Sequence, residues 1–229
     1  MTALVVLPGL DGTATLHSGF SDAANHLFES VAVIPYPLEQ PLGYLELETL
    51  VRAALPPTAP FVLLGESFSG PVALSIGADP PSNLVAVVLS TSFGNSPLPA
   101  LSPLAAFARF APVRSVPLSL LSWWLLGPWA TPELESSLRD ALLAVSPAVL
   151  RFRAAAALRA SLPTLAAVSV PVLYLRATQD RLLSPSAGER LVSSLPQCTL
   201  TDIAGPHLLL QAAPQACARA VGDFARHLG

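Results

Sequence analysis

The chain has 229 residues, which is enough for one domain with a large buried core, or for one domain with an insertion. Only 12% of the residues are charged, the formal net charge is −3 and there is no basic run, so the composition argues against nucleic-acid binding. All twelve cationic residues are arginine, which excludes Schiff-base, P-loop and general-base chemistry that depends on a lysine.

The N-terminus, the cysteines and the histidines restrict the function further. Residues 1–7 have no cationic segment and run directly into an apolar stretch, unlike a secretory signal peptide. Cys198 and Cys217 have neither metal-binding nor redox spacing, and we interpret them as small core residues in a reducing compartment. The four histidines contain no H-E-x-x-H motif or i,i+4 pair, so no metal or other cofactor is predicted. The expected location is cytoplasmic.

The first part of the chain alternates between β-branched apolar runs and segments with helical periodicity. Strands are predicted at residues 3–7, 31–34, 61–64 and 84–89, with helices at 18–28, 43–55 and after residue 70. Near-continuous apolar strands separated by helices are typical of a parallel sheet that is covered by helices on both faces.

One predicted strand leads into a turn that contains a serine. The sequence Gly-Glu-Ser-Phe-Ser-Gly occupies residues 65–70, and helical spacing follows directly. A strand, a sharp turn and a helix around Gly-x-Ser-x-Gly lift the serine hydroxyl above the sheet, beside N–H groups that can face an oxyanion. Ser69 stands where glycine is usual, and we interpret it as a tolerated departure. The alternative is an ordinary strand-to-helix turn that contains a serine.

The alternation stops between Gly94 and Pro163. This stretch is rich in proline and alanine, contains three tryptophans, and predicts a helical lid (94–163) over the carboxyl edge of a core formed by residues 1–93 and 164–229. Its apolar run at residues 116–130 is only about 15 residues long and is broken by two prolines, so no integral membrane segment is expected. The alternative is a set of helices that pack into the core.

The alternation then resumes, and two later loops carry a carboxylate and an imidazole. Strands are predicted at 168–175 and 199–203, and helices at 187–195 and 208–228, which gives six strands in total. Asp180 and His207 each follow one of these strands. A serine nucleophile needs a base to take its proton, and the base needs a carboxylate to orient it. The chain order Ser67, Asp180, His207 is the order that occurs when the nucleophilic serine lies on a strand-to-helix turn.

These assignments have competing interpretations. His207 could cap the last helix, and Asp202 is a second carboxylate, although it lies inside the final strand rather than on a loop. The loop after Leu89 offers no acid. The loop at residues 8–13, Pro-Gly-Leu-Asp-Gly-Thr, should supply one N–H of an oxyanion hole, and the residue after the nucleophile should supply the other. Leu10 is preferred over Asp11, whose side chain could instead fold the loop.

Together, residues 8–13, residues 65–70, the Asp180 loop and Gly-Pro-His at 205–207 resemble α/β hydrolases of the serine esterase, lipase and thioesterase group. The resemblance covers the whole chain except the insertion. It implies the α/β-hydrolase fold, with a mainly parallel six-stranded sheet, helices on both faces and a helical lid. It also implies roles for five residues: Ser67 as nucleophile, His207 as base, Asp180 as its orienting acid, and Leu10 and Phe68 as oxyanion donors. Glu66, next to the nucleophile, is unusual. It could be a solvated neighbour or a hydrogen-bond anchor for the turn, and it receives no chemical role.

The resemblance implies a carboxylesterase of the EC 3.1.1 class that works through an acyl-enzyme, and the apolar insertion favours small or medium aliphatic acyl esters. Trp123 and Trp124 are candidate contacts for the acyl group. Acyl transfer or thioester hydrolysis on the same residues is the alternative, and a binding protein without turnover is disfavoured by the complete Ser, Asp and His set. The expected partner is a small-molecule ester. Six arginines in the insertion would suit a carrier protein, although scattered arginines are more often solvated: Arg109, Arg114, Arg139, Arg151, Arg153 and Arg159.

Overall fold

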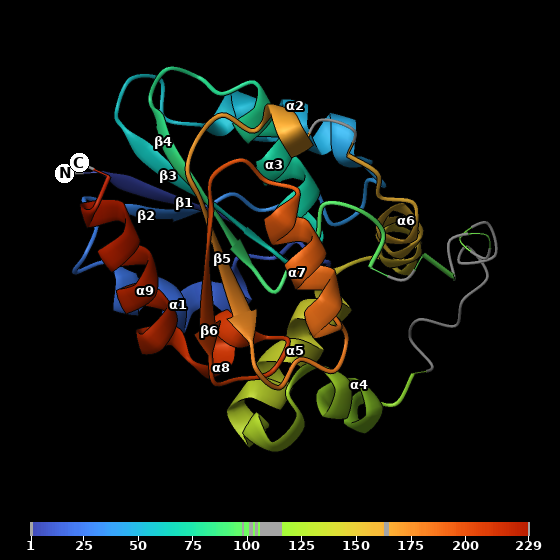
Figure 1. Cartoon of the computed structure of the whole chain (residues 1–229). Coiled ribbons are helices and arrows are strands. Elements are labelled where there is room, and N and C mark those ends of the chain that lie inside the picture. Colours follow the sequence, from blue (N-terminus) through green and yellow to red (C-terminus); the bar gives the residue numbers. More distant parts are fainter. Residues whose placement is uncertain are drawn as a thin grey trace.

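The computed structural model describes residues 2–97, 99, 100, 103, 105, 116–162 and 165–228. Within these residues, six parallel strands form one sheet in the order β2-β1-β3-β4-β5-β6, which confirms the predicted architecture (Figure 1). The strands are β1 (Ala3–Leu7), β2 (Val31–Val33), β3 (Phe61–Glu66), β4 (Leu84–Ser90), β5 (Val172–Ala177) and β6 (Cys198–Ile203).

Helices cover both faces of the sheet. On one face lie α1 (Ser18–Ala24), α8 (Leu209–Ala212) and α9 (Pro214–Arg226), and on the other lie α2 (Tyr44–Ala54), α3 (Gly70–Ala78) and α7 (Pro185–Ser193) (Figure 1). Successive side chains of a strand point to opposite faces, so Leu4 and Val6 enter one core and Val5 and Leu7 the other. Every residue of β1 and β3 is buried, which explains why β1 is entirely apolar and why β3 is apolar up to Glu66 at its carboxyl end.

The sheet brings the functional loops to one edge. The chain leaves β1 toward β2 on one side and leaves β3 toward β4 on the other, although β1 and β3 are neighbours with Leu7 opposite Gly65. The loops after β1 and β3 therefore diverge at a reversal in strand order, which is where open α/β sheets bind ligands. Because all the strands are parallel, the loops after β5 and β6 open at this same edge.

Between β4 and β5, the described residues contain helices and no strand. This part of the chain contains α4 (Leu118–Leu125), the 3₁₀ turn η4 (Gly127–Trp129), α5 (Pro132–Ala144), α6 (Pro147–Leu158) and the 3₁₀ turn η5 (Leu165–Ala167). Thr131 and Ser146 cap α5 and α6, and a proline occupies the first turn of each. The division at 94–163 into a separate lid stays a prediction. Two of its arginines, Arg109 and Arg114, lie outside the described residues.

Within the part of the chain that the structure describes, no single helix is long and apolar enough to cross a membrane. Helices α5 and α6 pass that test only as a pair, by length and composition, and they are bent by 101° relative to each other.

Three elements differ from the predictions by more than two residues or by a break. The first helix ends at Ala24 instead of residue 28, and the short 3₁₀ turn η1 (Thr15–His17) precedes it. β5 begins at Val172 instead of residue 168, because Pro171 has no N–H to donate to a ladder. The closing helix is divided into α8 and α9, because Pro214 forces Ala213 out of the helical region, at φ −133° and ψ 52°.

Candidate active site

The strand, turn and helix expected around Ser67 are present. β3 ends at Glu66, the 3₁₀ turn η2 spans Ser67–Ser69, and α3 begins at Gly70. Ser67 has φ +45°, a left-handed conformation that costs a residue with a Cβ about 1–3 kcal/mol. A Cβ at Gly65 would lie 2.9 Å from the Ser69 carbonyl oxygen, and one at Gly70 only 1.9 Å from Ser92 Oγ. Glycine at position 65 therefore lets the turn and α3 pack close to β3, and glycine at position 70 lets α3 begin close to the loop after β4.

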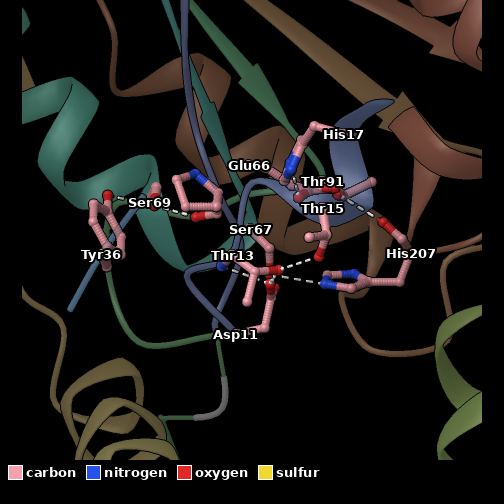
Figure 2. Close-up of polar contacts among 11 residues, drawn as sticks. Asp11, Thr13, Thr15, His17, Tyr36, Glu66, Ser67, Ser69, Thr91 and His207 are labelled. Carbon is pink, nitrogen blue, oxygen red and sulfur yellow. Dashed lines mark hydrogen bonds and ion pairs between the residues drawn. The ribbon is translucent and has the colours of Figure 1, made fainter. Parts of the chain in front are cut away.

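The structure brings Ser67, His207 and Asp180 together in a hydrogen-bonded chain. Ser67 Oγ lies 2.8 Å from His207 Nε2 (Figure 2), and His207 Nδ1 lies 2.9 Å from Asp180 Oδ2. The other oxygen of Asp180 accepts the N–H groups of Leu182 and Leu183 at 2.7 and 2.9 Å. The side chains of His207 and Asp180 are 3% and 8% exposed. A carboxylate on Nδ1 places the imidazole proton there, which leaves Nε2 to accept the serine proton.

The loop after β4 supports this chain. Thr91 Oγ1 donates to the backbone carbonyl of His207 at 2.8 Å (Figure 2), and Ser92 Oγ donates to the carbonyl of Ser67 at 2.5 Å. The loop therefore fixes the backbones of two candidate catalytic residues. The loop sequence contains no acid, and adjacent hydroxyl residues such as Thr91 and Ser92 are too common in proteins to identify such a role.

The loop after β1 is closed by its own hydrogen bonds. The Gly12 N–H donates to the Gly9 carbonyl at 3.0 Å, and Asp11 Oδ2 accepts both the N–H and the hydroxyl of Thr13, at 2.8 and 2.5 Å. The side chain of Asp11 thus folds the loop, as one of the two interpretations expected. Within the described residues, the Leu10 N–H donates to no protein acceptor, so it is available to a ligand.

A buried arginine in α6 also holds the loop after β1 in place. Arg153 is fully buried, and its Nη1 donates to the carbonyls of Leu10 and Asp11 at 3.0 and 2.8 Å. Its Nη2 donates to the Pro37 carbonyl at 2.8 Å, and its guanidinium lies over the Tyr36 ring, 5.4 Å from the centroid. Burial lowers the pKa of Arg153, but an arginine starts so far above neutral pH that it keeps its charge. No sequence pattern distinguishes this arginine from the others in the insertion.

Ser69, the residue where glycine is usual, also contacts the loop. Its hydroxyl donates to the carbonyl of Pro8 and lies 2.7 Å from the Tyr36 hydroxyl (Figure 2). Because the Ser69 proton is used on Pro8, the Tyr36 hydroxyl must be the donor in the second contact. The serine therefore ties the nucleophile's turn to the loop after β1, which a glycine could not do.

Glu66 forms a buried ion pair with His17. His17 Nε2 lies 2.8 Å from Glu66 Oε2, and the two side chains are 0% and 1% exposed (Figure 2). Burial alone would raise the pKa of Glu66 and lower that of His17, but their mutual attraction outweighs burial. The pKa of Glu66 therefore lies below its ordinary value and that of His17 above it. The pair anchors the end of β3 to η1, so Glu66 is not a solvated neighbour of the nucleophile.

This pair should make stability depend on pH. The raised pKa of His17 means that its contribution is complete below about pH 6.5 and is lost as pH rises through the folded-state pKa. The lowered pKa of Glu66 means that its contribution is lost only in acid. Replacing His17 with glutamine should cost about 3–5 kcal/mol of unfolding free energy near pH 6, because Glu66 stays buried without a counter-charge. The cost should shrink toward pH 9.

Urea unfolding of wild type and His17→Gln across this pH range measures the difference. His26→Gln, at an exposed position, is the matched control and should change little. A cost for His17→Gln that is the same at every pH would show that the imidazole is not charged in the folded protein.

The remaining candidate residues lie elsewhere. Asp202, the competing carboxylate, is 49% exposed and bonds Arg176 at 2.6 and 2.9 Å, so it does not orient His207. Trp123 and Trp124 are 54% and 44% exposed. Neither lines the apolar cavity of about 350 Å³ that lies between α4, α5 and α6, and their contact with a substrate stays a prediction. Side chains around this cavity include Leu10, Leu118, Leu121, Leu142, Leu150 and Ala154, with Arg139 as the charged member.

No family model matches the chain, and no curated protein sequence matches it. Solved structures do. The chain is similar to an enol-lactonase from Burkholderia xenovorans LB400 (18% identity, TM-score 0.80, covering 98% of this chain and 91% of that one). It is also similar to a malate-bound thermophilic esterase from Thermogutta terrifontis (20% identity, TM-score 0.76, covering 100% of this chain and 90% of that one). MenH from S. aureus is a third similar structure (15% identity, TM-score 0.77, covering 99% of this chain and 94% of that one). The chain therefore has the α/β-hydrolase fold.

Proposed function

We propose that the protein is a serine hydrolase that cleaves carboxylic esters through an acyl-enzyme. The observation that carries this proposal is the hydrogen-bonded chain Ser67, His207 and Asp180, with the serine on a left-handed turn at the carboxyl edge of the sheet. A serine hydroxyl is a weak nucleophile until a base takes its proton, and here a buried imidazole oriented by a carboxylate is in position to do so.

The reaction proceeds in two halves. Ser67 Oγ forms a bond to the ester carbonyl carbon while its proton passes to His207 Nε2. That proton then goes to the leaving alkoxy oxygen as the bond between it and the carbonyl carbon breaks, which leaves an acyl-serine and an alcohol. Water then attacks the acyl carbon and gives a proton to His207 Nε2. As the bond between the acyl carbon and Ser67 Oγ breaks, that proton passes to Oγ, which releases the acid and regenerates Ser67. Asp180 stabilises the imidazolium in both halves.

The oxyanion that forms in each half would accept the N–H groups of Leu10 and Phe68. The Leu10 N–H has no protein acceptor, and the Phe68 N–H directly follows the nucleophile. The Phe68 ring is buried and stacks on Tyr44 with centroids 4.9 Å apart, which restrains the backbone at this point. Preorganised donors are typically worth 10²- to 10³-fold in rate.

The apolar cavity is the proposed acyl site. Leu10 belongs to the oxyanion loop and also lines the cavity, so a chain attached to the reacting carbonyl can enter it. The surrounding helices α4, α5 and α6 would then act as the lid, and their leucines favour an aliphatic acyl group.

A chain-length series of p-nitrophenyl esters tests this proposal. The specificity constant should rise from acetate to a medium chain by roughly two- to fourfold per methylene, because burying each CH₂ contributes about 0.8 kcal/mol. Ala154→Phe should fill the cavity and flatten the series while sparing acetate. Trp124→Ala, at an exposed residue outside the cavity, is the comparison: flattening there instead would place the acyl chain against the tryptophan.

A wild-type series that falls from acetate onward would contradict the acyl site but not the nucleophile. Product analysis with added alcohol separates hydrolysis from acyl transfer, since transfer would give a new ester in place of the acid.

A further inference from the structure

The segment Leu118–Trp129, formed by α4 and η4, contacts the loops of both Asp180 and His207. The Leu208 N–H, next to His207, donates to the Leu125 carbonyl at 3.0 Å. Trp129 Nε1 donates to Gln179 Oε1 at 2.9 Å, and Arg181 Nη1 donates to the Trp123 carbonyl at 2.7 Å. Gln179 and Arg181, which flank Asp180, and Leu208, which follows His207, are therefore all hydrogen-bonded to the Leu118–Trp129 segment.

Arg181 makes the most specific of these contacts. Its guanidinium lies 4.4 Å from the centroid of the Trp123 ring and also bonds the carbonyl of that residue, which combines a cation–π contact with a charge-assisted hydrogen bond. The guanidinium also lies close to Gly127. That glycine has φ +54°, and a Cβ there would be 3.1 Å from Arg181 Cζ, so the segment has no side chain where the arginine sits.

Holding Arg181 also holds the carboxylate. Asp180 Oδ1 accepts the N–H groups of Leu182 and Leu183, so Arg181 lies within the tight turn that this oxygen closes. Asp180 Oδ2 faces His207 Nδ1. A shift of Arg181 therefore moves the turn and, with it, the oxygen that orients the imidazole.

We propose that Arg181 is a positioning residue that clamps the Leu118–Trp129 segment to the Asp180 turn and so sets the orientation of His207. The same segment reaches the apolar cavity through Leu118 and Leu121, which connects the acyl site to the acid and the base. This inference rests on the proposed ester hydrolysis. A clamp that acts through Asp180 and His207 should affect kcat, whereas a residue that only binds substrate should affect KM.

Arg181→Met, which keeps much of the apolar side chain and removes the donors, should lower kcat for p-nitrophenyl acetate by about 10- to 100-fold with little change in KM. Arg181→Lys keeps one cationic donor and should recover part of that loss. Arg159→Met, at an exposed arginine that follows α6, is the matched control and should keep wild-type kcat.

Proton NMR reports on the same geometry without turnover. The Nδ1 proton shared by His207 and Asp180 should give a downfield resonance in the wild type that Asp180→Asn removes. In Arg181→Met this resonance should broaden or move upfield, while in Arg159→Met it should stay in place. A purely structural arginine would lower the thermal midpoint and leave the resonance unchanged below the transition.

Gly127→Ala supplies a second, uncharged perturbation of the clamp. The added methyl would lie 3.1 Å from Arg181 Cζ, so the guanidinium must shift by a few tenths of an ångström, and the left-handed backbone at φ +54° adds strain in the same segment. This variant should therefore reproduce part of the loss of kcat and of the NMR change. Gly19→Ala is its control, because a Cβ at Gly19 meets nothing within 4 Å. The double variant Gly127→Ala with Arg181→Met should lose little more than the worse single variant, since both disrupt one contact.

Wild-type kcat and an unchanged resonance in Arg181→Met would overturn the clamp, as would a rise in KM alone. Labelling by a fluorophosphonate keeps this outcome distinct from a failure of the proposed function. Wild-type protein that does not label at Ser67 would refute the hydrolase, whereas labelling of wild type and Arg181→Met at equal rates would refute only the clamp.

Discussion

Replacing Ser67 with alanine should lower kcat/KM for a p-nitrophenyl ester by about six orders of magnitude and leave thermal unfolding close to that of the wild type. The hydroxyl is the proposed nucleophile, and its hydrogen bond is to His207. Alanine and serine both carry a Cβ, so the left-handed backbone at this position costs them about the same. His207→Ala should cost as much as Ser67→Ala, and the double variant should add little, because the residues act as a unit.

Kinetics with purified variants, together with intact-mass analysis after fluorophosphonate treatment, measure this result. The label should add once per chain, and peptide mapping should place it on Ser67. Ser75→Ala, on the helix α3 that follows the turn of Ser67, is the control, because its hydroxyl bonds Glu48 at 2.6 Å and takes no part in the site. Near-normal esterase activity in Ser67→Ala would end the argument for a serine nucleophile.

Asp180→Asn should lower kcat by about four orders of magnitude, while the comparable change Asp202→Asn should leave it within about twofold. The amide removes the negative charge that stabilises the imidazolium, and its NH₂ group can turn toward Nδ1 and favour the wrong tautomer of His207. Asp202, an exposed residue of β6, instead forms an ion pair with Arg176 of β5. Surface ion pairs contribute little to stability.

Steady-state kinetics of both aspartate variants on one ester decide between the carboxylates. If Asp202→Asn were the more damaging change, the orienting acid would have to come from β6, and the bond from Asp180 to His207 would not exist in solution.

Much of this fold could be predicted from the sequence because its strands are buried on both faces. Such strands appear as short apolar runs, and the intervening helices have their own periodicity. The shifted start of β5 and the break before Pro214 could have been predicted as well, since Pro171 and Pro214 are visible in the sequence. The predicted start of β5 and the predicted unbroken closing helix are wrong because the apolar pattern continues across Pro171 and Pro214, whereas the backbone structure does not.

The candidate site was only partly accessible to the same reasoning. Ser67, Asp180 and His207 each occupy a recognisable loop in a meaningful order. The contacts that support them join distant parts of the chain, as in the bond from Arg153 to Asp11 and the pair of His17 with Glu66. No local spacing encodes such partners, and whether a tryptophan in the insertion is exposed depends on packing that the sequence does not display.

The buried guanidinium of Arg153 limits how this scaffold could evolve or be engineered toward new substrates. The helical insertion connects β4 to β5, which are neighbours in the sheet. It therefore looks like a unit that could be replaced by the insertion of another α/β hydrolase. The donor insertion would also have to bring an arginine that reaches the carbonyls of Leu10 and Asp11. A chimera without it would have a loosened loop after β1, which carries the proposed oxyanion donor. We therefore expect new specificity to be easier to obtain by point changes around the proposed acyl cavity than by recombination.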